Sequence, residues 1–273
     1  MSKGFLYVAN RQKFVNEALI SVKSLKRFNR EPVCLICTAA LNTEEVQKAF
    51  DSVIEMEELI NHTYLSKVVG MQNSPWDHTI FLDSDTFITD KISELFEILE
   101  LVDFATTLEQ KLHTTNIKDL NYKNIFPEFN TGVIVYRKNS VMEKVLADWL
   151  QFCLGKKMGN DMPGLREAVL MNFDAVRFSV LPNCYNEHGF TSMLQLDQRV
   201  KIIHERIGYK KRVITPHFAD FETMDRFAER INSIHHKRFY IPKLGIISYR
   251  WSPQNIILYF KKKLGYKRVS KNK

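Results

Sequence analysis

Short apolar runs alternate with amphipathic segments from residue 4 to residue 181, and this alternation restricts the fold more than any other feature of the sequence. The predicted strands cover residues 4–10, 32–38, 52–56, 78–83, 103–108, 131–137 and 176–181. The predicted helices cover residues 12–28, 43–50, 64–72, 91–100, 140–153 and 163–172. Strands that alternate with helices build βαβ units, so the sequence predicts an α/β fold with a mostly parallel, doubly wound sheet.

The chain has 273 residues, 45% of them hydrophobic and 26% charged, which is a globular composition. This length fits one large α/β domain or two small ones. Because no linker interrupts the first part, we expect a catalytic domain over 1–215 and a basic helical extension over 216–273. We expect no transmembrane helix, which needs roughly 18 apolar residues in a row, and no secretory signal.

The cysteines are interpreted as free thiols, although Cys34 and Cys37 have the C-x-x-C spacing of zinc and redox sites. No second pair of Cys or His accompanies them, and they lie in an apolar run where Cys packs as a small hydrophobe. Thiols without a disulfide framework fit a reducing compartment, so we expect a cytoplasmic protein.

The stretch TIFLDSDTFITD, from Thr79 to Asp90, leads an apolar strand directly into two carboxylates, Asp83 and Asp85. Residues i and i+2 of an extended strand face the same way, so we expect both carboxylates on one face and Ser84 on the other. A divalent cation there binds carboxylate and phosphate oxygens together and stabilises a diphosphate leaving group. A solvated turn is the simpler interpretation of Asp-Ser-Asp taken alone.

The run IFLDSDTFI resembles the D-x-D strand of the GT-A nucleotide-sugar glycosyltransferases, in particular family 8 and its relatives. The resemblance extends over residues 4–211, because further segments agree with the family in their order. These segments are YVAN (7–10), SKVVGMQNSPWDHTIFLDSD (66–85), FNTGVIVYRKN (129–139), GNDMPGLREAV (159–169), LPNCYN (181–186) and KIIHERIGYKK (201–211).

The resemblance implies a GT-A type, Rossmann-like domain that binds a nucleotide-diphosphate sugar. It implies a metal site, with Mn²⁺ or Mg²⁺, at Asp83, Asp85 and His204, and imidazole suits manganese. The residues implied to bind the donor are Tyr7, Val8, Ala9, Asn10, Lys67, Asp83, Ser84, Asn130, Gly132, Asn186, Gly208 and Lys210.

Two carboxylates, Asp161 and Glu187, are candidates near the reacting centre. Asp161 also precedes Met162 and Pro163, the usual start of a helix, so we expect it to act as an N-cap as well. Met162 stands where relatives often carry Gln, which puts the stereochemical outcome in doubt, and we favour retention. Taken singly, His204 fits a satisfied polar residue at a strand end, and Lys67 fits a solvated charge.

The C-terminal part of the chain is strongly basic. Residues 201–273 hold 18 Lys and Arg against 5 Asp and Glu, while the whole chain has a net charge of +8. Residues 253–268 are predicted to form a helix with an apolar face beside Lys261, Lys262 and Lys263, which is typical of a helix lying on an anionic membrane. The alternative is a helix packed on the domain, and no recognition motif supports nucleic acid as a partner.

The sequence therefore predicts a metal-dependent glycosyltransferase that uses a UDP-sugar and a glycan or lipid-linked acceptor, as a cytoplasmic protein that is peripheral on the inner face of a membrane. Two alternatives remain. The first is a non-catalytic protein that binds sugar nucleotides or glycans through a degenerate site, which Met162 suggests. The second is a nucleotidyltransferase, which would usually show a Gly-rich phosphate loop near the N-terminus, where YVANRQK has none.

Overall fold

The structure is a computed structural model. It describes residues 1–61, 64–109, 122, 125–156, 160–188, 194–196, 199–204, 207–208, 213–214, 220–232, 238–241 and 245–248. The predicted helix at 253–268 and Lys210 therefore lie outside the described residues.

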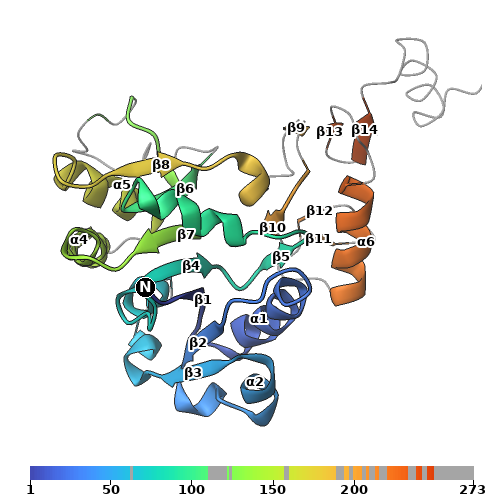
Figure 1. Cartoon of the computed structure of the whole chain (residues 1–273), viewed down its shortest axis with the longest axis horizontal. Helices are drawn as coiled ribbons and strands as arrows, with labels where there is room; N and C mark the ends of the chain where they lie inside the picture. Colours follow the sequence, from blue (N-terminus) through green and yellow to red (C-terminus); the bar gives the residue numbers. More distant parts are fainter. Residues whose placement is uncertain are drawn as a thin grey trace, which may run out of the picture.

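A seven-stranded sheet forms the centre of the molecule (Figure 1). Its strands are β1 (Lys3–Ala9), β2 (Val33–Cys37), β3 (Ser52–Glu55), β4 (His78–Leu82), β6 (Phe104–Leu108), β7 (Phe129–Arg137) and β8 (Phe178–Val180). They lie in the order β3-β2-β1-β4-β7-β6-β8. Strand β7 is antiparallel to both neighbours and the other pairs are parallel, so the predicted mostly parallel α/β sheet is confirmed.

The antiparallel course of β7 follows from the connection before it. Parallel neighbours need a crossover, usually a helix, whereas the sequence between β6 and β7 is polar and rich in turn residues. As a result, the N-terminal end of β7 meets the C-terminal end of β4, where Leu82 pairs with Val133. This arrangement brings the Asn-Thr-Gly start of β7 to the edge where the parallel strands end.

Helices cover both faces of the sheet. The α-helices are α1 (Gln12–Leu25), α2 (Glu44–Ala49), α3 (Ser66–Gln72), α4 (Ser140–Lys156), α5 (Met162–Met171) and α6 (Phe221–Asn232). The 3-10 helices are η1 (Ala39–Leu41), η2 (Glu57–Asn61), η3 (Ser93–Glu100) and η5 (Asn183–Tyr185). The amphipathic segment at 91–100 was expected to be an ordinary helix, and it forms the tighter η3 instead.

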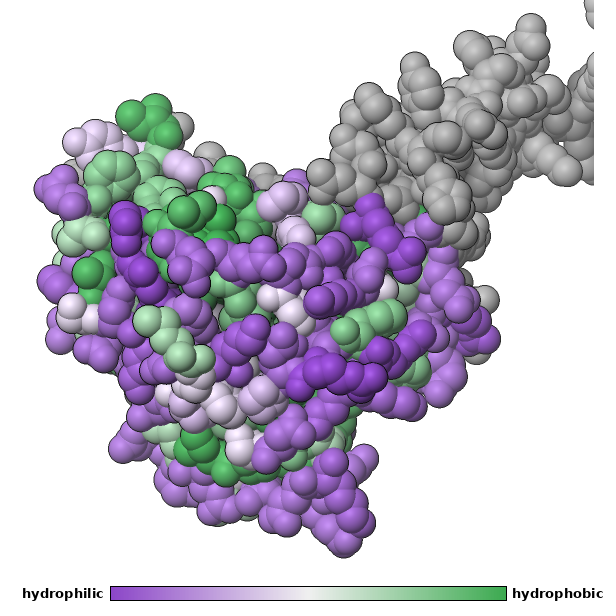
Figure 2. Space-filling view, in the orientation of Figure 1, coloured by the Kyte–Doolittle hydropathy of each residue, from purple (hydrophilic) through white to green (hydrophobic). Residues whose placement is uncertain are grey.

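The alternation of side chains along β1 separates two apolar cores. Phe5 and Tyr7 pack on one face with α1 and η3, whereas Leu6 packs on the other face with α3, α4 and α5. This period of two is what a strand buried on both sides requires. The outer surface in Figure 2 is largely hydrophilic, and its apolar residues gather in patches near the β8 and β3 ends of the sheet.

Smaller sheets lie beside the main one. Strand β5 (Thr86–Ile88) pairs with β10 (Ile202–His204), and β11 (Ile207–Gly208) pairs with β12 (Val213–Ile214). Strand β13 (Arg238–Ile241) pairs with β9 (Leu194–Leu196) and β14 (Gly245–Ser248). The region after 216 thus contains strands as well as helix α6, and the boundary at 215 stays a prediction.

Helix α6 packs on the body through a third apolar cluster. This cluster contains Phe87 of β5, Ile203 of β10 and Met224 of α6. Arg27, just after α1, forms an ion pair of 2.5 Å with Asp225. Among the helices of the described residues, none has both the length and the apolar character that crossing a bilayer requires. The four cysteines are free thiols, as predicted.

Asp103 ties three strands together at the start of β6. Its Oδ1 accepts hydrogen bonds from Arg137 Nη2 at 2.7 Å and Asn139 Nδ2 at 2.8 Å, and its Oδ2 accepts from the Arg177 backbone N–H at 2.8 Å. Burial alone would raise the pKa of Asp103, but these donors outweigh it and lower the pKa.

Replacement of Asp103 by Asn should lower the free energy of unfolding by about 1.5–3 kcal/mol at neutral pH, because charge-assisted hydrogen bonds are lost. A lowered folded-state pKa gives stability that is complete above the unfolded value of about 3.9 and is lost as pH falls through the folded value. Urea denaturation should therefore show the difference between wild type and Asp103→Asn shrinking below about pH 4. The exposed Asp174→Asn is the control, and a difference independent of pH would contradict this account.

Candidate active site

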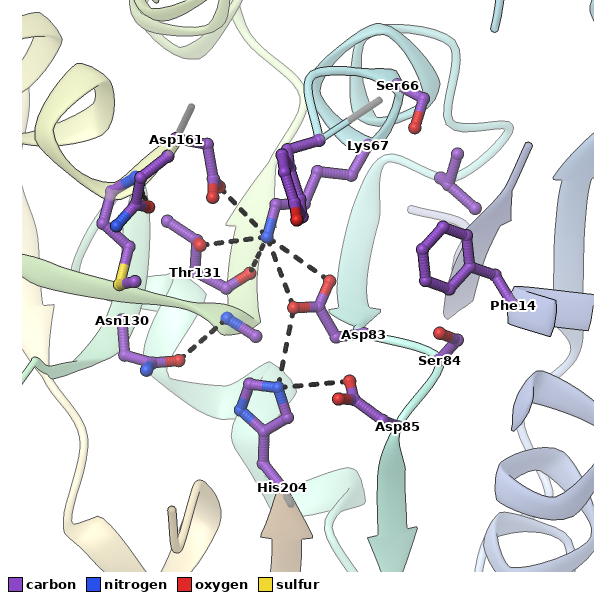
Figure 3. A pocket seen from close by; sticks show the side chains of 15 residues that line it. Phe14, Ser66, Lys67, Asp83, Ser84, Asp85, Asn130, Thr131, Asp161 and His204 are labelled. Carbon is purple, nitrogen blue, oxygen red and sulfur yellow. Dashed lines mark hydrogen bonds and ion pairs between the residues drawn. The ribbon is translucent and has the colours of Figure 1, made fainter. Parts of the chain in front are cut away.

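Asp83, Asp85 and His204 lie together at the C-terminal end of β4 (Figure 3). One ligand atom from each lies within 4.8 Å of the others. His204 Nε2 is 3.6 Å from Asp83 Oδ2 and 3.4 Å from Asp85 Oδ1. Two carboxylates and an imidazole are a donor set that fits a divalent cation such as manganese.

The two aspartates meet through a turn rather than along a strand. Strand β4 ends at Leu82, and the backbone N–H of Thr86 donates to Asp83 O at 3.2 Å, which closes a turn over Asp83–Ser84–Asp85. The expected strand alternation is therefore wrong at this point, although the carboxylates still face one cluster. Antiparallel pairing of β5 with β10 places His204 opposite Thr86, which brings the third ligand to the same turn.

Helix α1 holds this turn in place from behind. Ser84 Oγ donates to the buried carboxylate of Glu17 at 3.0 Å, Thr86 Oγ1 lies 2.9 Å from Ser21 Oγ, and Ile88 N–H donates to Ser24 Oγ at 2.9 Å. Glu17, Ser21 and Ser24 are spaced at four and three residues, so they lie on one helix face. A polar stripe on an otherwise apolar helix face thus fixes the position of the candidate ligands.

Lys67 of α3 lies at the centre of the site (Figure 3). Its Nζ is 3.0 Å from Asp161 Oδ2, 3.3 Å from Asp83 Oδ2 and 2.9 Å from Thr131 Oγ1. Burial alone would lower the pKa of Lys67, but the charges of Asp161 and Asp83 outweigh it and raise the pKa. Lys67 is therefore a charged, paired group inside the site and not a solvated surface lysine.

Burial raises the pKa of Asp83, and the negative charges of Asp85 and Asp161 raise it further. The positive charges of Lys67 and His204 lower the pKa, but they offset this rise only in part. Three carboxylates thus share a small volume with one lysine and one histidine. Such a concentration of negative charge attracts a further cation, because each added positive charge relieves the mutual repulsion.

Asp161 immediately precedes α5, and its side chain points into the site. Its carboxylate pairs with Lys67 and makes no capping hydrogen bond, so the expected N-cap role is wrong. The Trp149 indole N–H of α4 donates to Asp161 O at 2.8 Å and anchors this corner. A Cβ at Gly164 would lie 2.6 Å from Trp149 Cδ1, so Gly164 permits α5 to approach α4 this closely.

The start of β7 supplies the next part of the site. Asn130 Oδ1 accepts a hydrogen bond from the Gly132 backbone N–H at 2.9 Å, and Asn130 Nδ2 donates to Glu109 Oε2 at 2.8 Å. A Cβ at Gly132 would lie 2.1 Å from His204 Cε1, so only glycine leaves room for the imidazole. The close approach of His204 therefore explains why a glycine stands at position 132, where the sequence pattern predicted a contact with the donor.

The candidate metal ligands, Lys67 and Asp161 line one cavity of about 390 Å³. The lining residues are Val8, Phe14, Tyr64, Ser66, Lys67, Asp83, Ser84, Asp85, Asn130, Thr131, Gly132, Asn160, Asp161, Met162 and His204. Ser84 lines it although strand alternation placed it on the opposite face. Sequence reasoning missed Phe14, Tyr64, Ser66, Thr131 and Asn160, of which Thr131 had a signal because it lies inside the Asn-Thr-Gly motif.

Other predicted residues lie outside the lining. Tyr7 and Ala9 are buried in β1, and the Tyr7 hydroxyl lies 2.8 Å from Ser21 Oγ. Asn10 Nδ2 donates to Leu59 O at 3.2 Å. Glu187 is buried and its backbone O accepts from His204 N–H at 3.0 Å, so it supports the ligand strand.

Two further predicted residues do not line the cavity either. Asn186 lies behind His204, whose Nδ1 is 2.9 Å from Asn186 Oδ1. Gly208 lies in β11, opposite Val213 of β12.

No protein-family model and no curated protein matches the sequence. Solved structures do match the fold. Mouse xyloside xylosyltransferase 1, apo form, gives a TM-score of 0.52 at 15% identity, over 79% of this chain and 100% of that chain. Glycosyltransferase GlyE of Streptococcus pneumoniae TIGR4 gives 0.53 at 13% identity, over 100% and 67%. The WbbM bifunctional glycosyltransferase, apo structure, gives 0.52 at 13% identity, over 92% and 46%.

These likenesses show that the chain has the fold of the GT-A glycosyltransferases. The resemblance inferred from the sequence motifs is thus confirmed at the level of the fold, with the D-x-D turn at the C-terminal end of a central strand. The narrower assignment to family 8 stays a prediction.

Replacement of Lys67 by Met should lower the free energy of unfolding of the metal-free protein by about 3–5 kcal/mol, because the buried carboxylate of Asp161 and the partly buried carboxylate of Asp83 lose their cation. Urea denaturation measures this loss. The control is Lys48→Met, which removes the exposed ion pair of 2.6 Å with Glu44 and should cost at most about 0.5 kcal/mol. Similar small losses in both variants would contradict a buried, paired Lys67.

Proposed function

We propose that the protein is a metal-dependent glycosyltransferase that moves a sugar from a nucleotide-diphosphate sugar, with UDP as the nucleotide, to a hydroxyl group of a glycan or lipid-linked acceptor. The observation that carries the proposal is the cluster of Asp83, Asp85 and His204 in the same cavity as Lys67 and Asp161. The structural neighbours support sugar transfer, since all three are glycosyltransferases.

Asp83, Asp85 and His204 would hold the cation, Mn²⁺ or Mg²⁺. When bound, the cation neutralises the diphosphate and stabilises it as a leaving group. The carboxylates alone would repel a diphosphate, so donor binding should depend on the metal. Gly208 and Lys210 are proposed to contact the phosphates from the segment after His204. Asn186 does not line the cavity and would act on the donor site from behind, through its contact with His204.

The donor would lie along the cavity between β1 and α5. Val8 and Phe14 form an apolar wall at the β1 end, which suits the nucleoside. Tyr7, Ala9 and Asn10 are proposed to hold the backbone of this wall in position. Asn130, Gly132 and Asp161 lie at the β7 and α5 end, where they would contact the sugar. Ser84 lies between the two ends, at the D-x-D turn.

In the proposed reaction, the bond from the anomeric carbon to the phosphate oxygen breaks and a bond to the acceptor oxygen forms, while the acceptor hydroxyl gives its proton to the departing diphosphate. A carboxylate beside the anomeric carbon stabilises the positive charge that develops there. We assign this role to Asp161 rather than Glu187, because Asp161 lines the cavity and Glu187 does not. Lys67 orients Asp161 through their ion pair of 3.0 Å, and we favour retention of configuration.

A second function, binding without catalysis, is favoured by one observation. Met162 lines the cavity next to Asp161 and brings a thioether, which offers only a weak hydrogen-bond acceptor, to the place where a reacting sugar would lie. Such a protein would hold the nucleotide sugar through the same cluster and leave it intact.

Manganese should tighten UDP binding by the wild-type protein, and Asp85→Asn should lose this enhancement. Mutation of a residue that only contacts a metal ligand typically weakens metal affinity by roughly 10- to 100-fold. Asp85 is a proposed ligand itself, so we expect Asp85→Asn to weaken metal-dependent UDP binding by more than this. Titration calorimetry with and without the metal measures both quantities. Asp90→Asn is the matched control, because Asp90 belongs to the same segment but pairs with Arg199 at 3.0 Å. Equal binding by wild type and Asp85→Asn would refute the metal site.

Incubation with a panel of UDP-sugars and manganese should release UDP slowly without acceptor, because water intercepts an activated sugar. Asp161→Asn should slow this release by about 100-fold or more, with UDP binding kept, and Glu187→Gln should have a smaller effect. A coupled assay for UDP measures the rates. Tight UDP binding with no release from any donor would favour the binding function.

We also propose that the basic C-terminal segment binds an anionic membrane surface and so brings the protein, as a peripheral cytoplasmic enzyme on the inner face, to a lipid-linked acceptor. Residues 248–273 contain no acidic residue and combine lysines with aromatic and aliphatic side chains.

Removal of residues 249–273 should abolish sedimentation with anionic liposomes and leave UDP and metal binding intact. Each Lys or Arg near the surface contributes about 1 kcal/mol, which salt screens. Neutral liposomes or raised salt should therefore weaken binding of the full chain. A lower melting temperature of the truncated protein, with no change in liposome binding, would instead assign the segment to the folded core.

A further inference from the structure

A buried chain of polar contacts leads from Glu109 to the candidate metal ligand His204. Asn130 Nδ2 donates to Glu109 Oε2 at 2.8 Å, Asn186 Nδ2 donates to Asn130 Oδ1 at 2.7 Å, and His204 Nδ1 lies 2.9 Å from Asn186 Oδ1. Asn130 and Asn186 are 4% and 3% exposed, so the protein and not bulk water sets their partners.

The direction of these hydrogen bonds follows from one backbone group. The Gly132 N–H can only donate, and it lies 2.9 Å from the side chain of Asn130, so the atom that faces it must be Oδ1. The same Oδ1 lies next to Asn186, which must therefore present its NH₂ group there. The second atom of the Asn186 amide, Oδ1, is then left to face His204.

This order determines which nitrogen of His204 carries a proton. Asn186 Oδ1 can only accept, so His204 Nδ1 must donate, and the proton of the neutral imidazole resides on Nδ1. The lone pair of the ring is then on Nε2, the atom that lies 3.4 Å from Asp85 Oδ1 and 3.6 Å from Asp83 Oδ2. The ring cannot turn freely, because it packs directly against Gly132.

From this geometry we infer that Asn186 is a positioning residue that fixes the Nδ1–H tautomer of His204 and so presents the Nε2 lone pair to the cation site. Asn186 does not line the cavity, and it reaches the cation site through His204. The hydrogen bond from Asn186 to Asn130 fixes which end of the Asn186 amide faces His204, because Gly132 fixes the orientation of the Asn130 amide. The consequence for metal affinity rests on the proposed metal-dependent function, whereas the tautomer of His204 does not.

The test compares Asn186→Ala and Asn186→Asp with wild type. Two-dimensional ¹H–¹⁵N spectra of the metal-free protein report the tautomer, at a pH where imidazoles are neutral and with His204 identified by its absence in His204→Gln. Wild type should show Nδ1–H. Asn186→Ala should shift toward Nε2–H, and Asn186→Asp should retain Nδ1–H because its carboxylate still accepts.

Manganese titration by calorimetry is the second measurement. Asn186→Ala should weaken the affinity by about 10- to 100-fold, as loss of a partner behind a ligating histidine does, and Asn186→Asp should recover part of it. The matched control is Asn172→Ala, since Asn172 is also buried but bonds to Asp148 and Ala168. It should lose stability without losing manganese affinity.

Two results would overturn the inference. One is a wild-type His204 with its proton on Nε2, and the other is an equal loss of manganese affinity in Asn186→Ala and Asn172→Ala. A wild-type protein that binds no manganese refutes the proposed function instead, and the tautomer of His204 then decides the inference alone.

Discussion

The ammonium group of Lys67 lies between the carboxylates of Asp83 and Asp161, and three parts of the fold meet at this contact. Lys67 comes from α3, Asp83 follows β4, and Asp161 precedes α5. Without the lysine, the carboxylates would repel one another across a partly buried space, where water screens charge poorly. Among the described residues that line the cavity, Lys67 is the one lysine or arginine, and the Asp83–Asp85 side of the cluster is therefore left for a second cation.

The reversed direction of β7 is what brings the remaining groups to this charge. Because β7 is antiparallel to β4, its first residues lie beside the last residues of β4, and Asp83 N–H donates to Gly132 O at 2.8 Å. A parallel strand would place the same motif at the opposite edge of the sheet. The Asn-Thr-Gly segment thus contacts Lys67 through Thr131 and His204 through Gly132.

The sequence predicts the strands, most helices and the grouping of Asp83, Asp85 and His204 well, because these depend on local periodicity and on motifs in a fixed order. It fails where a distant partner decides the outcome. Asp161 looks like an N-cap in isolation, but Lys67 draws its carboxylate into the site. The hydrogen bond from Ser84 to Glu17 could not be predicted from the sequence around either residue. A glutamate on a helix is normally expected at the surface, and its burial depends on how the helix packs.

Asp83 and His204 are far apart in the chain, and they meet only after β10 has paired with β5. Such long-range pairing closes a large loop, which has an entropic cost. A cation that bound all three groups would bind only molecules in which β10 is paired with β5, and it would stabilise that pairing. Metal occupancy would therefore report on whether this second, smaller sheet is in place.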